Sequence, residues 1–294
     1  MKKQLKISII TLSVLIGNNT LSQTITKPWM STEVGIAWSQ GYRGQGVNIT
    51  IVDDFKSNSV FKGNLNGVTQ IGRHGNWTSL EANMIAPAAK IFTQEYSTGK
   101  SVALGKGLNV VNLSYGMMAP AGYTKVGWSA QETSIIDYAR TGKAIISKAA
   151  GNDSGIAVGT KTRVGTLDYL NRDLIGAQSA IFVGSLNSNG TTAAKASIAN
   201  YSNIAGTNPI VQKQFLVVGV TGNTTGLYGT SFAAPIVSGY AAILGSKFTK
   251  STPTQITNQL LNTARTDTIA GYNAAIHGRG EASITRALAP VSIK

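Results

Sequence analysis

Ser231 has the surroundings of a reactive hydroxyl. It stands two residues after Gly229 and opens an apolar run in which Phe232 and Ile236 recur at helical spacing. Pro235 falls in the first turn of the expected helix, where its missing N–H is harmless. A hydroxyl at the positive end of a helix dipole favours developing negative charge, as a nucleophile requires. The same position also suits a serine that only caps the helix, so this segment leaves both roles open.

A serine nucleophile requires a general base, and the chain has two histidines. His74 stands at the start of an expected helix, whereas His277 lies in the glycine-rich stretch 275–280, with no helix or acidic partner expected nearby. Asp53 and Asp54 follow an expected strand, and either could orient an imidazole. A lone histidine can also be structural, and Asp54 can cap a turn. Hydroxyl, imidazole and carboxylate together would perform acyl transfer.

The elements that must position these residues alternate along the chain. The expected strands are apolar, β-rich runs at 47–52, 90–94, 109–113, 143–147, 180–184 and 215–218. The expected helices lie at 77–86, 131–140, 231–248 and 253–265. This alternation predicts an α/β fold with a mostly parallel sheet covered by helices on both faces. No linker or repeat divides the chain, so we expect a single domain.

Several segments, in order along the chain, resemble the subtilisin-like serine peptidases. Gly229-Thr-Ser-Phe-Ala-Ala-Pro235 is similar to their serine signature, and Ile51-Val-Asp53 is similar to their aspartate strand. His74-Gly75 and the segment 85–91 resemble their histidine helix and the strand after it. The order Asp, His, Ser is that of the subtilisins, and differs from those of chymotrypsin and the α/β-hydrolases. Weaker similarities lie at 44–46, 111–116, 149–152, 183–185 and 278–280.

The resemblance implies a subtilisin-like fold and a serine endopeptidase that forms an acyl-enzyme. Ser231 would be the nucleophile and His74 the general base. Asp53, rather than Asp54, would hold the imidazole in its useful tautomer. Asn152 aligns with the residue whose side-chain amide donates to the oxyanion.

The resemblance also implies a polypeptide substrate. Ser114, Tyr115 and Gly116 align with the strand that pairs with the substrate backbone, with a plain strand end as the alternative. The helix after His74 departs from the family pattern, most of all at Leu80, where a small residue is usual. An inactive or narrowly specific relative that binds a partner is therefore the alternative function.

The first residues of the chain predict export. A cationic start, an apolar stretch over 7–17 and small polar residues near Ser22 are typical of a secretory signal peptide, although a buried helix is the alternative. We therefore expect a signal peptide at 1–22 and a peptidase domain at 23–294, secreted or periplasmic. No other stretch approaches the ~18 apolar residues of a membrane span. The segment 23–46 is too short for a folded propeptide, so we expect folding without one.

Composition narrows the remaining classes of function. The net charge of +14 could attract nucleic acid, but the 26 Lys and Arg residues are scattered, so we expect no specific nucleic-acid partner. A basic surface-binding protein remains the third hypothesis. The chain has no cysteine, and no acidic loop has convincing calcium spacing. We therefore expect no metal and no cofactor, although calcium is common in the family that the chain resembles. We also expect the protein to be a monomer. An esterase or lipase is the fourth hypothesis, and it lacks support. The nucleophile motif of those enzymes requires a second glycine where this chain has Ala233.

Overall fold

The computed structural model describes residues 25–294, so the expected signal peptide lies outside the described residues. Its centre is a six-stranded sheet in the order β10-β9-β7-β5-β1-β4, and every neighbouring pair is parallel. The strands are β1 (Val47–Asp53), β4 (Lys90–Glu95), β5 (Leu108–Leu113), β7 (Ile145–Ala149), β9 (Ala180–Leu186) and β10 (Phe215–Gly219). The predicted α/β class and the six predicted strands are confirmed.

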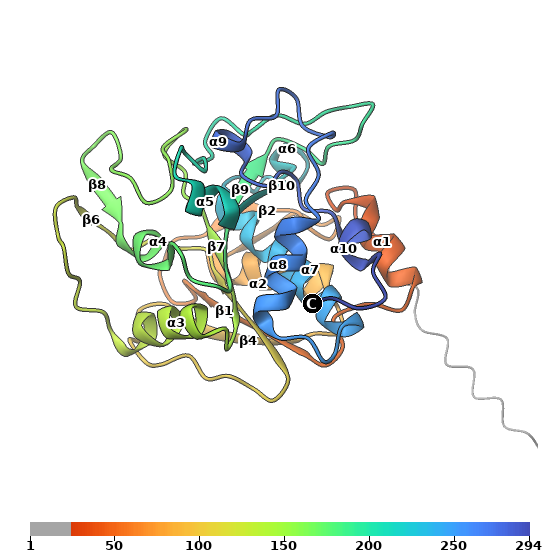
Figure 1. Ribbon diagram of the computed structural model, residues 1–294, viewed down its shortest axis with the longest axis horizontal. Helices are drawn as coiled ribbons and strands as arrows, with labels where there is room; N and C mark the ends of the chain where they lie inside the picture. Colours follow the sequence, from red (N-terminus) through yellow and green to blue (C-terminus); the bar gives the residue numbers. More distant parts are fainter. Residues whose placement is uncertain (1–24) are drawn as a thin grey trace, which may run out of the picture.

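Helices cover both faces of this sheet, as predicted (Figure 1). Ile145 of β7 packs into one buried cluster with α2 (His74–Ile85) and α7 (Ala234–Lys247). Its neighbour Ile146 packs into a second cluster with α3 (Ala130–Thr141). Alternate residues of a strand point to opposite faces, so a strand that is apolar throughout is buried on both.

The predicted helix over 231–248 is divided in the structure. A 3₁₀ turn, η1 (Thr230–Phe232), precedes α7, and Pro235 lies in the first turn of α7, as expected. The predicted helix over 253–265 is α8 (Pro253–Asn262), and it ends earlier than expected. The other helices are α1 (Thr32–Ser39), α4 (Tyr169–Leu174), α5 (Pro209–Gln214), α6 (Gly222–Thr225), α9 (Ala274–His277) and α10 (Ile284–Leu288).

Two antiparallel ribbons lie outside the main sheet. One pairs β2 (Phe61–Gly63) with β3 (Gln70–Gly72). The other pairs β6 (Met118–Pro120) with β8 (Thr166–Asp168), and Figure 1 shows it at the end of the molecule opposite α1 and α10. These short strands were not predicted, because three residues carry too little periodicity to be recognised.

The direction in which the chain adds strands to the sheet reverses between β1 and β5. After β1 the chain moves to the edge strand β4, returns to β5 on the other side of β1, and then adds β7, β9 and β10 outward. In open parallel sheets, ligands bind beyond the carboxyl ends of the strands at such a reversal. Asp53 ends β1 and Ser114 follows β5, so both residues lie at the carboxyl ends of the strands beside this reversal.

Candidate active site

Asp53 and His74 are in direct contact at the carboxyl end of β1. Nδ1 of His74 lies 2.6 Å from Oδ1 of Asp53. The second carboxylate oxygen of Asp53 accepts a hydrogen bond from the Thr78 hydroxyl at 2.8 Å. An ionised carboxylate only accepts, so Nδ1 of the imidazole carries the proton in this pair. The Nε2 atom of His74 is thereby left to accept a proton from another group.

Asp54, the other candidate carboxylate, has a local role. Its Oδ1 atom accepts the backbone N–H groups of Lys56 at 3.1 Å and Ser57 at 2.8 Å, and its Oδ2 atom accepts the Ser57 hydroxyl. Partial burial by itself would raise the pKa of Asp54, but these hydrogen bonds lower it below its usual value. Asp54 therefore caps a turn, and Asp53 is the carboxylate that contacts His74.

The helix that carries His74 fits closely against its neighbours. The N–H of Gly75 donates to the Asp54 carbonyl at 2.9 Å, and a Cβ at Gly75 would lie 2.7 Å from the Phe55 ring. Leu80, which departs from the family pattern, packs partly buried against the hydrophobic core. The bulky residue is thus accommodated without displacing His74 from Asp53.

Ser231 lies in η1, directly before α7. Its hydroxyl donates to the carbonyl of Ser114 at 3.0 Å, and the hydroxyl of Ser114 donates to the carbonyl of Ser231 at 2.8 Å. The N-cap of α7 is Ala233, so Ser231 is not the helix cap. The ring of Phe232 lies 5.4 Å from the ring of His74, which places η1 beside the imidazole. Within residues 25–294, no hydrogen bond joins the Ser231 hydroxyl to His74.

The side-chain amide of Asn152 is held in one orientation by Thr230. Its oxygen accepts the backbone N–H of Thr230 at 2.8 Å and the Thr230 hydroxyl at 3.0 Å. The amide nitrogen, Nδ2, makes no hydrogen bond within the described part of the chain and is free to donate. A Cβ at Gly229 would lie 3.1 Å from Nδ2, and the φ of Gly229 is +121°, so glycine is required there. Sequence reasoning missed Thr230, although it lies inside the serine motif.

Ser231, Asn152 and the segment 114–116 line one pocket of about 220 Å³. The pairing of β5 with its neighbours ends at Leu113, so Tyr115 and Gly116 lie beyond the paired part of the strand. An extended backbone beyond a strand end can pair with a peptide as an added strand. The substrate contact expected of Ser114, Tyr115 and Gly116 stays a prediction.

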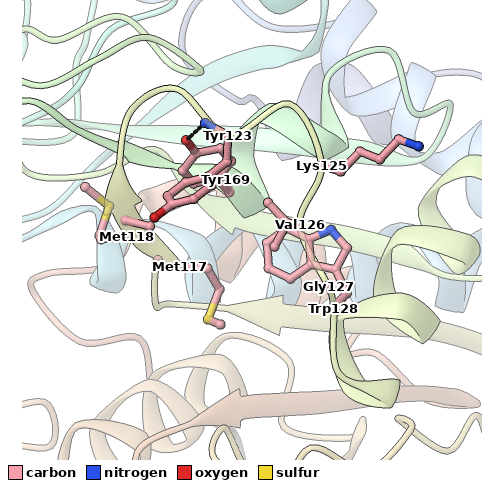
Figure 2. Close-up of a pocket in the computed structure, with 10 residues that line it drawn as sticks. Met117, Met118, Tyr123, Lys125, Val126, Gly127, Trp128 and Tyr169 are labelled. Carbon is pink, nitrogen blue, oxygen red and sulfur yellow. Dashed lines mark hydrogen bonds between the residues drawn. The ribbon is translucent and has the colours of Figure 1, made fainter.

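A larger cavity, of about 720 Å³, adjoins this pocket, and Gly116 and Met118 line both. The backbone N–H of Tyr123 donates to the Tyr169 hydroxyl at 2.9 Å, drawn as a dashed line in Figure 2, and this bond ties the loop after β6 to α4. Figure 2 shows the mainly apolar lining, which includes Met117, Met118, Val126, Trp128 and Tyr169.

His277 lies apart from these contacts. It is the last residue of the short helix α9, whose N-cap is Asn273. No helix was expected there, because four residues are too few to show a helical period. Its ring stacks on Tyr272 with centroids 5.9 Å apart, and burial lowers the pKa of His277. Within the described residues, no hydrogen bond or ion pair joins His277 to a carboxylate.

Among residues 25–294, no group of three or more His, Cys, Asp or Glu side chains is placed to hold a metal ion. In the same residues, no helix has the length and apolar character needed to cross a bilayer.

Sequence comparison identifies curated relatives of this chain. Subtilisin NAT of Bacillus subtilis subsp. natto and Subtilisin E of Bacillus subtilis (strain 168) are each 26% identical to it over 275 residues. Each alignment covers 82% of this chain and 65% of the relative, so the chain spans about two thirds of the length of these relatives.

Solved structures share the fold. MycP1 from the ESX-1 type VII secretion system has a TM-score of 0.58 at 18% identity, covering 90% of this chain and 86% of that chain. MycP1 from Mycobacterium smegmatis has a TM-score of 0.56 at 19% identity, covering 92% and 86%. The sequence profile of the Subtilase family matches residues 60–280, most of the described chain. The protein therefore belongs to the subtilase family.

Proposed function

We propose that this chain is an exported serine endopeptidase. Ser231 attacks a peptide carbonyl while His74 takes its proton, and Asp53 holds and stabilises the imidazolium that forms. His74 then protonates the leaving amine, and water releases the acyl group by the reverse steps. The 2.6 Å contact between Asp53 and His74 carries this proposal, because it commits Nδ1 to the carboxylate and leaves Nε2 as the proton acceptor.

The oxyanion of the tetrahedral intermediate would be stabilised by two donors. One is the free Nδ2 of Asn152, whose orientation is set by Thr230, and the other is the backbone N–H of Ser231. Both residues line the same pocket as Gly116, which supports their acting on one bound peptide.

A relative that binds polypeptides without cleaving them is the second candidate. The bond from the Ser231 hydroxyl to the Ser114 carbonyl favours it, because this bond must break before His74 can take the proton. Against this, catalytic hydrogen bonds often form only when substrate is bound. The two candidates share the pocket and differ only in the reactivity of Ser231.

A fluorophosphonate probe separates the two candidates. The chain of residues 1–294 is produced in bacteria, the exported fraction is purified, and the labelled peptide is mapped by mass spectrometry. We expect label on Ser231, hydrolysis of casein, and loss of both in Ser231→Ala but not in Ser39→Ala, an exposed serine of α1. Undiminished hydrolysis by Ser231→Ala would remove Ser231 as the nucleophile, and salt-sensitive DNA binding without labelling would favour the basic binding protein.

Export is tested on the same material. The N-terminal residue of the purified exported protein should lie near Gln23, as cleavage of a signal peptide at 1–22 requires. An unprocessed N-terminus on protein that stays in the cytoplasm would contradict export while leaving the peptidase proposal intact.

A further inference from the structure

Lys148 of β7 is buried, with 1% of its side chain exposed, and it lines the same pocket as Ser231. A buried ammonium group is stable only if it is paired and hydrogen-bonded. Its Nζ atom donates to Oδ2 of Asp168 at 3.1 Å and to the carbonyl of Ala149 at 2.8 Å. A lysine ammonium has three N–H donors, so one donor of Lys148 has no acceptor among the described residues.

The carboxylate of Asp168, the partner of Lys148, accepts nearly as many hydrogen bonds as it can. Its Oδ1 atom accepts three backbone N–H groups, those of Met117 at 3.0 Å, Leu170 at 3.1 Å and Asn171 at 3.3 Å. Its Oδ2 atom accepts only the Lys148 ammonium within residues 25–294, so one lone pair of Oδ2 remains. The pair thus presents one unused donor beside one unused acceptor, and its two charges cancel.

The backbone at Gly116 lies close to the Asp168 carboxylate. A Cβ at Gly116 would lie 2.8 Å from Oδ2 of Asp168, so only a glycine leaves the carboxylate uncovered. The pocket volume of about 220 Å³ is smaller than that of pockets for drug-sized ligands, which begin at about 300 Å³, and suits a single side chain. Because Ser231 and Asn152 also line it, the side chain that enters belongs to the residue whose carbonyl is attacked.

We propose that Lys148 and Asp168 form the floor of the pocket for the residue before the cleaved bond, and that they select a carboxamide side chain, glutamine above all. This inference rests on the proposed peptidase function. The glutamine oxygen would accept the unused Lys148 proton, and its NH₂ group would donate to the unused lone pair of Asp168. A lysine side chain would face the ammonium, and a glutamate side chain would face the carboxylate. Methionine would leave both groups unsatisfied.

The test uses four peptides that differ only in the residue before the bond, which is Gln, Glu, Lys or Met. We expect kcat/KM for the Gln peptide to exceed each of the others by about tenfold or more, since the unmatched peptides leave buried polar groups unpaired. Equal rates for Gln and Met, or a preference for Lys, would overturn the assignment.

Lys148→Met removes the spare donor and frees the Asp168 carboxylate. We expect the Gln-over-Met ratio to fall to about one and the Lys peptide to become the best of the four. The control is Lys143→Met, which removes an exposed lysine paired with Asp137 at 2.9 Å and should leave the profile unchanged. Should Lys148→Met fail to fold, it is combined with Asp168→Asn, which avoids an unpaired buried charge. This double variant should cleave the Glu peptide and the Lys peptide at equal rates. An unaltered Gln preference in a folded variant counts against the proposal.

Binding separates this inference from the function on which it rests. Product peptides ending in Gln, Glu, Lys or Met are titrated into wild type and Ser231→Ala by calorimetry, which requires no hydrolysis. Tighter binding of the Gln-terminated peptide supports the pocket even if the chain cleaves nothing, in which case only the peptidase proposal fails. Equal affinities for the four peptides reject the pocket assignment whether or not the chain is active.

Discussion

The hydroxyl of Thr78 donates a hydrogen bond to Oδ2 of Asp53 at 2.8 Å, one helical turn after His74. Thr78 and Asp53 are both buried. The bond therefore ties α2 to the end of β1 through the same carboxylate that contacts the imidazole. Thr78 thus gives Asp53 a second side-chain contact on α2, beside that of His74.

Thr78→Val tests this relationship. Valine has nearly the same shape but leaves the buried Oδ2 of Asp53 without this donor, which should lower the free energy of unfolding by about 1–3 kcal/mol. We expect kcat to fall severalfold with KM unchanged, because Asp53 positions the imidazole. Urea denaturation and steady-state kinetics measure both effects, and Thr78→Ser should restore them. A loss of stability with unchanged kcat would show that the bond serves only the fold.

Asn152→Ala should reduce kcat far more than it changes KM, because the oxyanion exists only during the reaction. We expect kcat to fall by about 10²–10³-fold, which is the loss known for the asparagine donor of subtilisin. The control is Asn223→Ala, an exposed asparagine that bonds the Tyr228 hydroxyl. An effect confined to KM would contradict the role of Asn152 as an oxyanion donor.

Thr230 should act as a positioning residue. Thr230→Val removes the hydroxyl that donates to Asn152 and accepts the N–H of Gly151 at 3.0 Å. Because the Asn152 amide is then held by one bond instead of two, we expect a smaller loss of kcat than in Asn152→Ala. Thr230→Ser keeps the hydroxyl and should recover most of the rate. Equal rates for the valine and serine variants would exclude this role.

Glu81 should make stability depend on pH. It is buried on α2, its Oε2 atom has no hydrogen-bond partner in the described chain, and burial raises the pKa of Glu81 well above its usual value. The unfolded chain releases this proton near the ordinary pKa of about 4.3. Protonated Glu81 therefore makes its full contribution to the free energy of unfolding below that pH. This contribution is lost as the pH rises toward the pKa of Glu81 in the folded state.

Glu81→Gln should flatten this dependence. We expect the unfolding free energy of wild type, measured in urea, to fall more between about pH 4 and about pH 8 than that of the variant. The control is Asp267→Asn, because half of the Asp267 side chain is exposed. Parallel pH curves for wild type and Glu81→Gln would contradict a buried, neutral Glu81.

Gly239 should be required for the packing of α7 against α2. A Cβ at Gly239 would lie 2.4 Å from the Ile85 side chain, whereas a Cβ at Gly127 would have no neighbour within 4 Å. Overpacking a core costs about 1–3 kcal/mol, so Gly239→Ala should be destabilising and Gly127→Ala should not. Thermal unfolding of the two variants compares them directly, and equal melting temperatures would refute the close approach.

Local patterns were sufficient for the main sheet and for the residue types of the site. The run 47–52 was recognisable as a strand because both faces of a parallel strand are buried, so its apolar residues are continuous. Ser231 was recognisable because glycine, serine and proline stand together at the start of a helical pattern. Such patterns involve only a few neighbouring residues, so they can be recognised in the sequence without the tertiary structure.

Contacts between distant segments could not be read in this way. The short ribbon of β6 and β8 has no periodicity of its own, yet β8 ends in Asp168 and brings it to Lys148. A lysine inside an apolar strand reveals no partner, since its partner comes from another part of the fold. The amide orientation of Asn152 likewise depends on Thr230, 78 positions away. Residue types and strand order are local properties, whereas the fit of the pocket floor arises only when the folded chain packs these segments together.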